Sequence, residues 1–162
     1  MGNGVLRPAG AGDLDELVEL VREFCHLGRR AFDREQVIAG LRPLLTDDSL
    51  GRVWFVADLQ RPAEHVGYAV LTWGWSVESG GRECRLDELH VRARGNGLAA
   101  LVLVELLEQA QAAGATKVLL QTEAHDRRAR EFFGAAGFDL TDSVWMSTHL
   151  DLMPPTQNQP RT

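Results

Sequence analysis

The sequence is poor in cysteine and contains no long apolar run. Its 162 residues include two cysteines, Cys25 and Cys84, without the paired spacing of a disulfide scaffold or a metal site. No stretch approaches the roughly 18 uninterrupted apolar residues that a membrane span needs. Residues 1–6 also lack the basic and apolar regions of a signal peptide. We therefore expect a reduced, cytoplasmic protein that binds no metal and does not cross a membrane.

Positive charge is also in short supply. There are 17 lysines and arginines against 23 acidic residues, which gives a formal net charge of -6. An acidic protein repels a phosphate backbone, which argues against nucleic acid as a partner. A small amine or a basic peptide suits this charge better, although acidic proteins also use their charge for solubility alone.

Length and composition indicate one ordinary globular domain. With 44% hydrophobic and 25% charged residues, the chain can bury one core but has no room for a second domain. We expect the domain over residues 1–152. Residues 153–162, rich in proline and amide side chains, are expected to form a disordered tail.

Apolar periodicity predicts the order of the helices and strands. Asp13 is expected to cap the first helix, with Glu16 reaching back to it. The predicted helices cover residues 13–25, 33–45, 97–113 and 126–136, and the predicted strands cover residues 5–8, 53–57, 65–73, 84–91, 117–122, 138–140 and 144–150. This order predicts an α/β fold with a mixed, largely antiparallel sheet flanked by helices.

The stretch from Leu89 to Ala100 reads as a strand, a glycine-bearing turn and the start of a helix. A helix N-terminus offers free N–H groups and a positive dipole end, and glycine lets an anion approach the backbone closely. A pyrophosphate fits such a turn, but plain chain reversal explains the turn alone equally well. The dinucleotide-binding and P-loop patterns are both absent.

Two separated motifs decide between these interpretations. The run Arg94-Gly95-Asn96-Gly97-Leu98-Ala99 matches a pattern of Arg or Gln, two residues, Gly, one residue, and Gly or Ala, and residues 129–138 carry an aromatic pair followed by Gly-Phe. With these motifs the chain resembles the GNAT superfamily of acetyl-CoA-dependent N-acetyltransferases over about residues 5–150. The resemblance implies the same α/β fold and direct acetyl transfer from acetyl-CoA to an amine in a ternary complex.

The resemblance also implies a site for acetyl-CoA. The amides of Gly95, Asn96, Gly97, Leu98 and Ala99 would hold the pyrophosphate, with Arg94 adding charge. The backbone of Leu89, His90 and Val91 would pair with the pantetheine arm, and one of its N–H groups could stabilise the oxyanion. Asp126 and Phe133 belong to the second cofactor motif, where relatives often carry asparagine and tyrosine.

An amine acceptor must lose a proton before or during its attack on the thioester. Asp87 and Glu88 stand on the strand before the turn, where relatives carry carboxylates proposed as the base. Successive strand residues face opposite sides, so only one of the two should reach the acceptor. We prefer Glu88, but alternation does not decide which side faces the cleft. A purely structural carboxylate, paired with Arg85 for example, remains an alternative.

Phe133 marks the main departure from the family, because many relatives have a tyrosine there that protonates the departing thiolate. A thiol with a pKa near 8.5 is already a tolerable leaving group, so catalysis remains the preferred interpretation. The alternative is a non-catalytic module of the same fold that binds acyl-CoA or another protein. A homodimer is also left open, with the strand residues Trp73 and Trp75 as a dimer contact.

Overall fold

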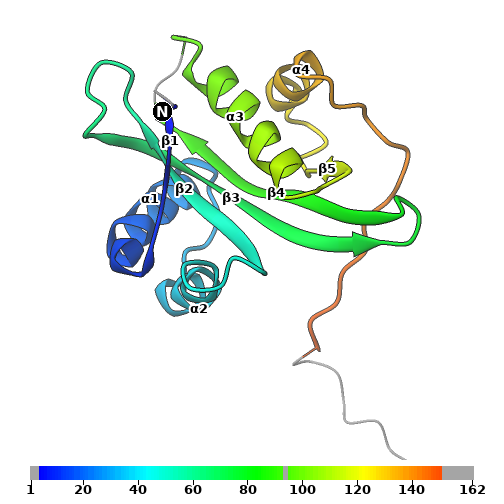
Figure 1. Cartoon of the computed structure of the whole chain (residues 1–162), viewed down its shortest axis with the longest axis horizontal. Coiled ribbons are helices and arrows are strands. Elements are labelled where there is room, and N and C mark those ends of the chain that lie inside the picture. The colour runs from blue at the N-terminus through cyan, green and yellow to red at the C-terminus, as the bar shows by residue number, and fades with distance from the viewer. Residues whose placement is uncertain (1–3, 93–94, 151–162) are drawn as a thin grey trace, which may run out of the picture.

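The computed structural model describes residues 4–92 and 95–150. Within these residues one sheet has the strand order β1-β2-β3-β4-β5 (Figure 1). Its strands are β1 (Leu6–Pro8), β2 (Gly51–Ala57), β3 (His65–Ser76), β4 (Gly81–Val91) and β5 (Lys117–Leu119). The first four strands pair antiparallel, and β5 pairs parallel to β4. This is the mixed, largely antiparallel sheet that the sequence predicts.

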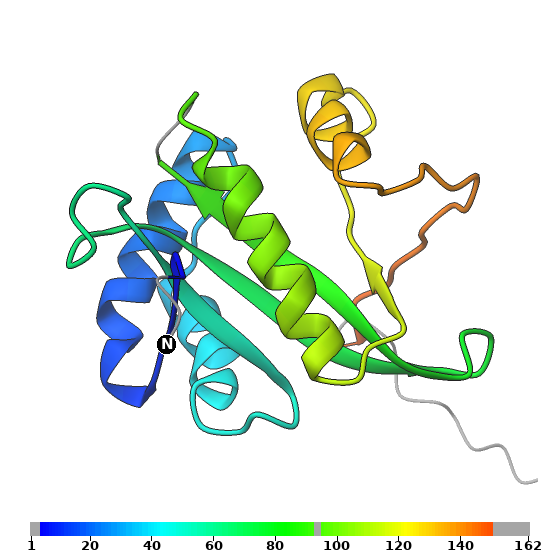
Figure 2. The same cartoon turned by 45° about the horizontal axis from the view of Figure 1, so that its top comes forward.

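Helices cover both faces of the sheet (Figures 1 and 2). On one face lie α1 (Leu14–Leu27) and α2 (Arg34–Leu44), and on the other lie α3 (Leu98–Ala112) and α4 (Arg127–Ala135). The crossover through α3 brings β5 into the same sheet, where it pairs parallel to β4. A short 3₁₀ helix, η1 (Ala11–Asp13), leads into α1.

Strand alternation divides the core into two clusters. In β3, Ala69 and Leu71 join the cluster beneath α3, whereas Tyr68 and Val70 join the cluster against α1 and α2. All four side chains are buried. Apolar residues on both sides of β3 explain why its sequence reads as an almost unbroken apolar run.

The helix N-termini correct one prediction. Asp33 caps α2 by accepting the amides of Glu35 and Gln36, and Asp126 caps α4 by accepting the amide of Ala129. The cap predicted at Asp13 is wrong: its carboxylate accepts the amide of Gly10 at the start of η1.

Glu16 does not reach back to Asp13 either, because its carboxylate lies 2.6 Å from a ring nitrogen of His65. The preceding turn of η1, which has no periodicity of its own in the sequence, is what moves Asp13 away from its predicted role.

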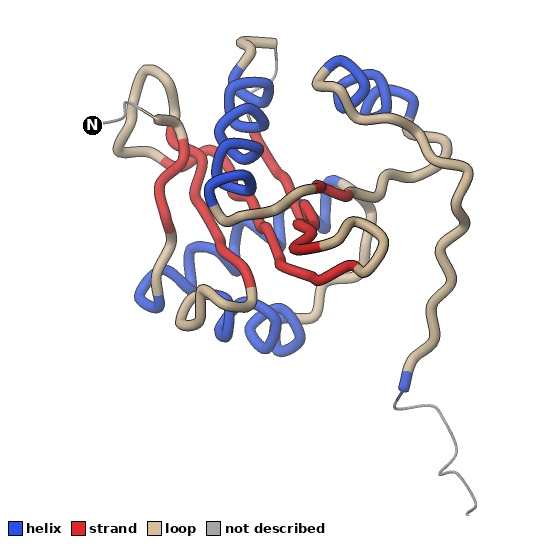
Figure 3. Tube along the Cα trace, turned by 45° about the vertical axis from the view of Figure 1, so that its right-hand side comes forward, coloured by secondary structure: helices blue, strands red, loops and turns tan. Residues whose placement is uncertain are grey.

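The predicted strands over residues 138–140 and 144–150 are also wrong within the described part of the chain. These residues form a loop that runs away from the sheet (Figure 3), and those after Phe138 are exposed. Similarly, β5 ends at Leu119 rather than at Thr122. A strand needs a neighbour that pairs with it, and periodicity alone does not supply one.

Candidate active site

The pairing of β4 with β3 changes register inside the candidate site. Val70 lies opposite Glu88, but the next residue, Leu71, lies opposite Leu86, so Asp87 is an extra residue on β4. Such a β-bulge shifts the alternation of side chains by one position. The bulge therefore decides how the two candidate carboxylates are placed, which simple alternation could not do.

Glu88 lies on the sheet face that α1 and α2 cover. It is half-buried, and its Oε2 accepts a hydrogen bond from the hydroxyl of Tyr68 at 2.5 Å. Tyr68 is fully buried in the core cluster of that face. The following strand residues Leu89 and Val91 pack against the opposite cluster, beneath α3. The structure thus gives Glu88 one fixed, partly sheltered position.

Asp87 points to solvent. Its side chain is 45% exposed, and its Oδ1 lies 3.5 Å from Nε of Arg85. This contact is the structural alternative described above, in which the carboxylate pairs with Arg85. Of the two carboxylates, Glu88 is therefore the better placed for a defined chemical role.

A carboxylate that the sequence analysis missed reaches the end of β4 from α1. Both oxygens of Glu23 accept hydrogen bonds from Nε of Arg92, at 2.9 and 2.8 Å, and Oε1 lies 3.0 Å from Nε2 of His90. The bonds from Arg92, helped by His90, lower the pKa of Glu23 from 4.5 to about 2, against the opposing effect of partial burial. Glu23 therefore remains ionised, and its hydrogen bonds link α1 to the end of β4.

The His90 side chain also contributes to the contact between α1 and β4. It is buried, and its ring stacks on Phe24 of α1 with the ring centres 5.3 Å apart. Glu23 occupies an ordinary polar position of an amphipathic helix, so no local sequence signal distinguishes it. Its importance comes from a contact 67 residues away in the chain.

Within residues 4–92 and 95–150, no strand pairs with the outer edge of β4 next to this cluster. β5 pairs with β4 only at Glu83, Cys84 and Arg85, whereas β4 continues to Val91. Because Arg92 donates its amide to Val66 of the neighbouring chain segment, the antiparallel alternation turns the backbone groups of Val91 and Leu89 toward the open edge. An extended ligand could pair with these groups as a further strand would.

The glycine turn connects this edge to the N-terminus of α3. Gly95 and Gly97 have φ values of 81° and 76°, and no heavy atom of the described residues, apart from each glycine and its chain neighbours, lies within 4 Å of where a Cβ would stand on either. The amide of Leu98 is bonded to the side chain of Asn96, and the amide of Leu101 to the carbonyl of Gly97.

Among the described residues, the amides of Ala99 and Ala100 have no hydrogen-bond partner. Open space over two glycines beside free amides fits the phosphates of a coenzyme A thioester. Arg94, predicted to add charge at this turn, lies outside the described residues.

The second motif places Phe133 on α4. Its ring packs edge-on against Phe132 and Phe138, with ring centres 5.1 and 5.7 Å apart, and it joins the partly buried rim of the core beneath α3. Asp126 is committed to capping α4 through the amide of Ala129. Both residues therefore have structural contacts in addition to their predicted place beside the cofactor.

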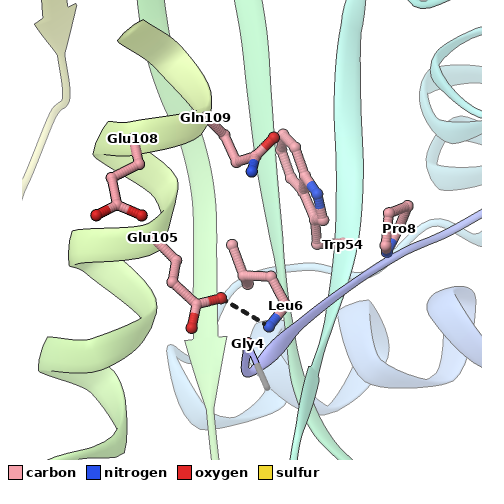
Figure 4. Close-up of a pocket in the computed structure, with 7 residues that line it drawn as sticks. All are labelled: Gly4, Leu6, Pro8, Trp54, Glu105, Glu108 and Gln109. Carbon is pink, nitrogen blue, oxygen red and sulfur yellow. Dashed lines mark hydrogen bonds between the residues drawn. The ribbon is translucent and has the colours of Figure 1, made fainter. Parts of the chain in front are cut away.

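A hollow of the described surface lies away from the candidate site. It measures about 520 Å³ and opens between β1 and the second half of α3 (Figure 4). Glu105, which lines it, accepts the amides of Val5 and Leu6 and so fastens the start of the chain to α3. Of the described residues, those that line this hollow include neither the glycine turn nor Asp87 and Glu88.

The comparisons with known proteins concern the family and the fold. Residues 14–138 match the family model of the acetyltransferase (GNAT) family. The chain belongs to this family. No curated protein matches it in sequence.

Solved GNAT-like structures cover nearly the whole chain. An integron cassette protein from the mobile metagenome of Cole Harbour Salt Marsh is 32% identical, with a TM-score of 0.78 over 93% of this chain and 92% of that one. A protein of Arthrobacter sp. FB24, named as a candidate acetyltransferase, is 21% identical with a TM-score of 0.77 over 93% and 98%. A ribosomal-protein-alanine N-acetyltransferase from Brucella melitensis biovar Abortus 2308 is 15% identical with a TM-score of 0.66 over 89% and 98%. The last two likenesses concern the fold alone.

Two further observations concern the described residues only. No three histidine, cysteine or acidic side chains in residues 4–92 and 95–150 come together in a way that could hold a metal ion. No helix in the same part of this GNAT chain has the length and apolar character to span a membrane.

Proposed function

We propose that this GNAT protein transfers the acetyl group of acetyl-CoA to a primary amine, by direct attack in a ternary complex. The observation that carries the proposal is the open edge of β4 at Leu89 and Val91, which the glycine turn and the free amides of α3 follow a few residues later in the sequence. An edge that can pair with an amide-bearing arm, followed by a phosphate-binding turn, matches the two ends of coenzyme A.

The backbone would hold the cosubstrate. The open groups of Leu89 and Val91 would pair with the amides of the pantetheine arm. The turn from Gly95 to Ala99, at the positive end of the α3 dipole, would hold the pyrophosphate. The outward N–H of Leu89 or Val91 would then donate to the thioester oxygen as negative charge develops on it.

Glu88 is proposed as the base. The amine nitrogen attacks the thioester carbon, its surplus proton passes to Glu88 directly or through one water, and the carbon–sulfur bond breaks as the new amide forms. Phe133 has no proton to give, so the departing thiolate takes its proton from water. The acidic charge of the chain, -6 in total, favours a small amine or a basic peptide as the acceptor.

The alternative is a module of the same fold that binds acyl-CoA without catalysis, and the specific observation that favours it is Phe133. One experiment separates the two functions: release of free thiol from acetyl-CoA in the presence of amines, polyamines, amino acids and basic peptides, with the acetylated product identified by mass. Thiol release that depends on an amine, with a product 42 Da heavier, supports the transferase, since acetylation adds about this mass for each acetyl group transferred. Tight acetyl-CoA binding without any product across this screen supports the binding module.

A further inference from the structure

The loop between α1 and α2 places an arginine near the candidate base. This loop, residues 28–33, joins the two helices that cover the sheet face of Glu88 (Figure 2). The guanidinium carbon of Arg30 lies 4.6 Å from the ring centre of Phe24. Phe24 in turn packs edge-on against Tyr68, with ring centres 6.2 Å apart, and Tyr68 donates its hydrogen bond to Glu88. A positive and a negative side chain therefore contact the same pair of aromatic rings.

The end of α1 fixes the position of Arg30. The amide of Arg30 bonds to the carbonyl of Cys25 at 2.8 Å, and the amide of Arg29 bonds to that of His26 at 3.1 Å. Arg29 has a φ of 52°. These bonds and this left-handed residue form a Schellman motif, in which the next residue often makes an apolar contact with the last turns of the helix. Here an arginine takes that position and lies over Phe24.

The charge of Arg30 has no acidic partner in the part of the chain that the structure describes. None of the ion pairs there includes Arg30 or Glu88. The acidic residues near the loop bind other groups: Asp33 accepts the amides at the start of α2, and Glu23 binds Arg92. Arg30 is also exposed. An exposed guanidinium that is held on an aromatic ring can receive an anion from solution.

The phenol of Tyr68 lies within electrostatic reach of both charges. Burial and then the charge of Glu88 raise the pKa of Tyr68, and the charge of Arg30 acts on the same phenol in the opposite direction. Because Glu88 and Arg30 do not pair with each other, the two opposite charges are left for a ligand that carries both signs.

We propose that the acceptor of this acetyltransferase is an amino acid, whose amine meets Glu88 and whose carboxylate binds the guanidinium of Arg30. This inference rests on the proposed function and names its acceptor class. An amine and a carboxylate in one small molecule match the two charges that contact the Phe24–Tyr68 pair. A guanidinium can bind a carboxylate through two parallel hydrogen bonds, which orient the ligand as well as hold it. The bound carboxylate then restricts the direction from which the amine approaches the thioester.

Calorimetry with coenzyme A present tests the carboxylate contact without any reaction, because no acetyl group is available for transfer. The probes are alanine, phenylalanine, β-alanine and 4-aminobutyrate, each paired with its own carboxamide. The net charge of -6 favours the cationic amide, so a preference for the acid has to come from a local positive group. We expect the wild type to bind at least one amino acid about 10-fold or more tightly than its amide. Equal affinities in every pair, or no binding of any probe, would overturn the proposal.

Substitutions at Arg30 separate the carboxylate contact from the role of this residue at the helix end. Arg30→Leu keeps an apolar contact with Phe24 but removes the charge, so the preference for the acid should be lost while the Tm changes little. Arg30→Lys keeps a positive charge and should retain part of the preference.

Arg29→Gly is the matched control, because it removes the neighbouring charge and suits the positive φ at that position. It should keep the full preference for the acid. If Arg30→Leu retains the wild-type preference, or if Arg29→Gly loses it equally, the carboxylate does not bind Arg30.

Thiol release from acetyl-CoA with the same pairs distinguishes this inference from the proposed function. In a transferase, Arg30→Leu should raise KM for the amino acid about 10-fold or more, with kcat and the KM for the amide little changed. Equal kcat/KM for acids and amides would reject the amino-acid acceptor and leave the transferase in place. Binding that prefers the acid and depends on Arg30, without thiol release, would support the amino-acid site and reject the transferase.

Discussion

The hydroxyl of Tyr68 donates a hydrogen bond to Oε2 of Glu88, with 2.5 Å between the two oxygens. The two residues come from adjacent strands, and the β-bulge at Asp87 is what turns Glu88 toward the phenol. Burial, and then the charge of Glu88, raise the pKa of Tyr68 far above its ordinary value. The phenol therefore keeps its proton and holds the carboxylate in one orientation.

Tyr68 is the only tyrosine of the chain, so its titration can be observed directly. We expect the folded protein to show no tyrosinate in its ultraviolet difference spectrum up to about pH 11, because burial opposes the phenolate. In denaturant the same chain should titrate near pH 10, which serves as the control. A tyrosinate signal near pH 10 from protein that remains folded would show that the hydrogen bond to Glu88 is not maintained.

Substitutions at Glu88 and Asp87 distinguish the roles of the two carboxylates. Glu88→Gln keeps an oxygen that can accept from Tyr68 but cannot take a proton, so we expect kcat to fall roughly 10²-fold with little change in acetyl-CoA affinity. Asp87→Asn, the neighbouring change at an exposed side chain, is the matched control and should keep wild-type kcat within a few-fold. Steady-state kinetics with the best amine of the screen measure both. Wild-type turnover by Glu88→Gln would rule out Glu88 as the base.

The role of Gly97 in cofactor binding can be tested by comparison with Gly114, a glycine of similar conformation. Gly97→Ala and Gly114→Ala each place a Cβ in open space at positive φ, 76° and 82°, and each should cost about 1 kcal/mol in the free energy of unfolding. Only Gly97 stands at the proposed phosphate site, since Gly114 follows the other end of α3. Acetyl-CoA should raise the Tm of the wild type and of Gly114→Ala, and raise that of Gly97→Ala much less. Equal shifts in all three proteins would place the cofactor elsewhere.

The ion pair between Glu23 of α1 and Arg92 at the end of β4 should make the free energy of unfolding decrease in acid. The pKa of Glu23 is about 2 in the folded protein against 4.5 for the free group, so the ionised form stabilises the fold fully above pH 4.5. This contribution is lost as the pH falls from 4.5 toward 2. We expect Glu23→Gln to lose about 1 to 2 kcal/mol of unfolding free energy at pH 7, after allowing for the solvent exposure of Arg92, and less than about half of that at pH 3.

Urea unfolding at the two pH values measures this difference. Glu64→Gln removes an exposed ion pair with Arg61 and is the control, with little effect expected at either pH. If Glu23→Gln costs the same free energy at pH 3 as at pH 7, the carboxylate of Glu23 is not held ionised by Arg92.

Phe133→Tyr restores the hydroxyl that many relatives carry. If water or the cofactor sulfur satisfies this hydroxyl, we expect a modest gain in kcat, roughly 2- to 10-fold, because a phenol can protonate the departing thiolate. The wild type, which has no such phenol, should show no loss of turnover near pH 10. Amine-dependent thiol release measured from neutral to alkaline pH checks both expectations. A clear loss of rate in a stably folded Phe133→Tyr protein would contradict the proposed arrangement around the leaving group.

The local pattern of the sequence determined most of the elements and their order. The helical spacing of apolar residues predicts α1, α2, α3 and α4, and the hairpin β3–β4 is predicted from its flanking strands and turn, although both strands extend farther than the pattern indicates. The turn from Gly95 to Ala99 could be predicted because its chemistry is local: the glycines and the first amides of α3 are neighbours in the chain. For the same reason Asp33 and Asp126 are identifiable as helix caps, since a cap bonds residues two or three positions away.

Only the tertiary structure decided the features that depend on distant partners. The choice between Asp87 and Glu88 rests on a bulge, which arises from the register of β4 against β3 and has no periodic signal of its own. Glu23 contributes to the site because it accepts hydrogen bonds from Arg92, which is 69 residues away in the chain. Tyr68 contributes because it donates a hydrogen bond to Glu88 on the next strand. The strand pattern at residues 144–150 was present in the sequence, but a strand forms only where another strand pairs with it, and within one copy the described chain leaves that segment unpaired.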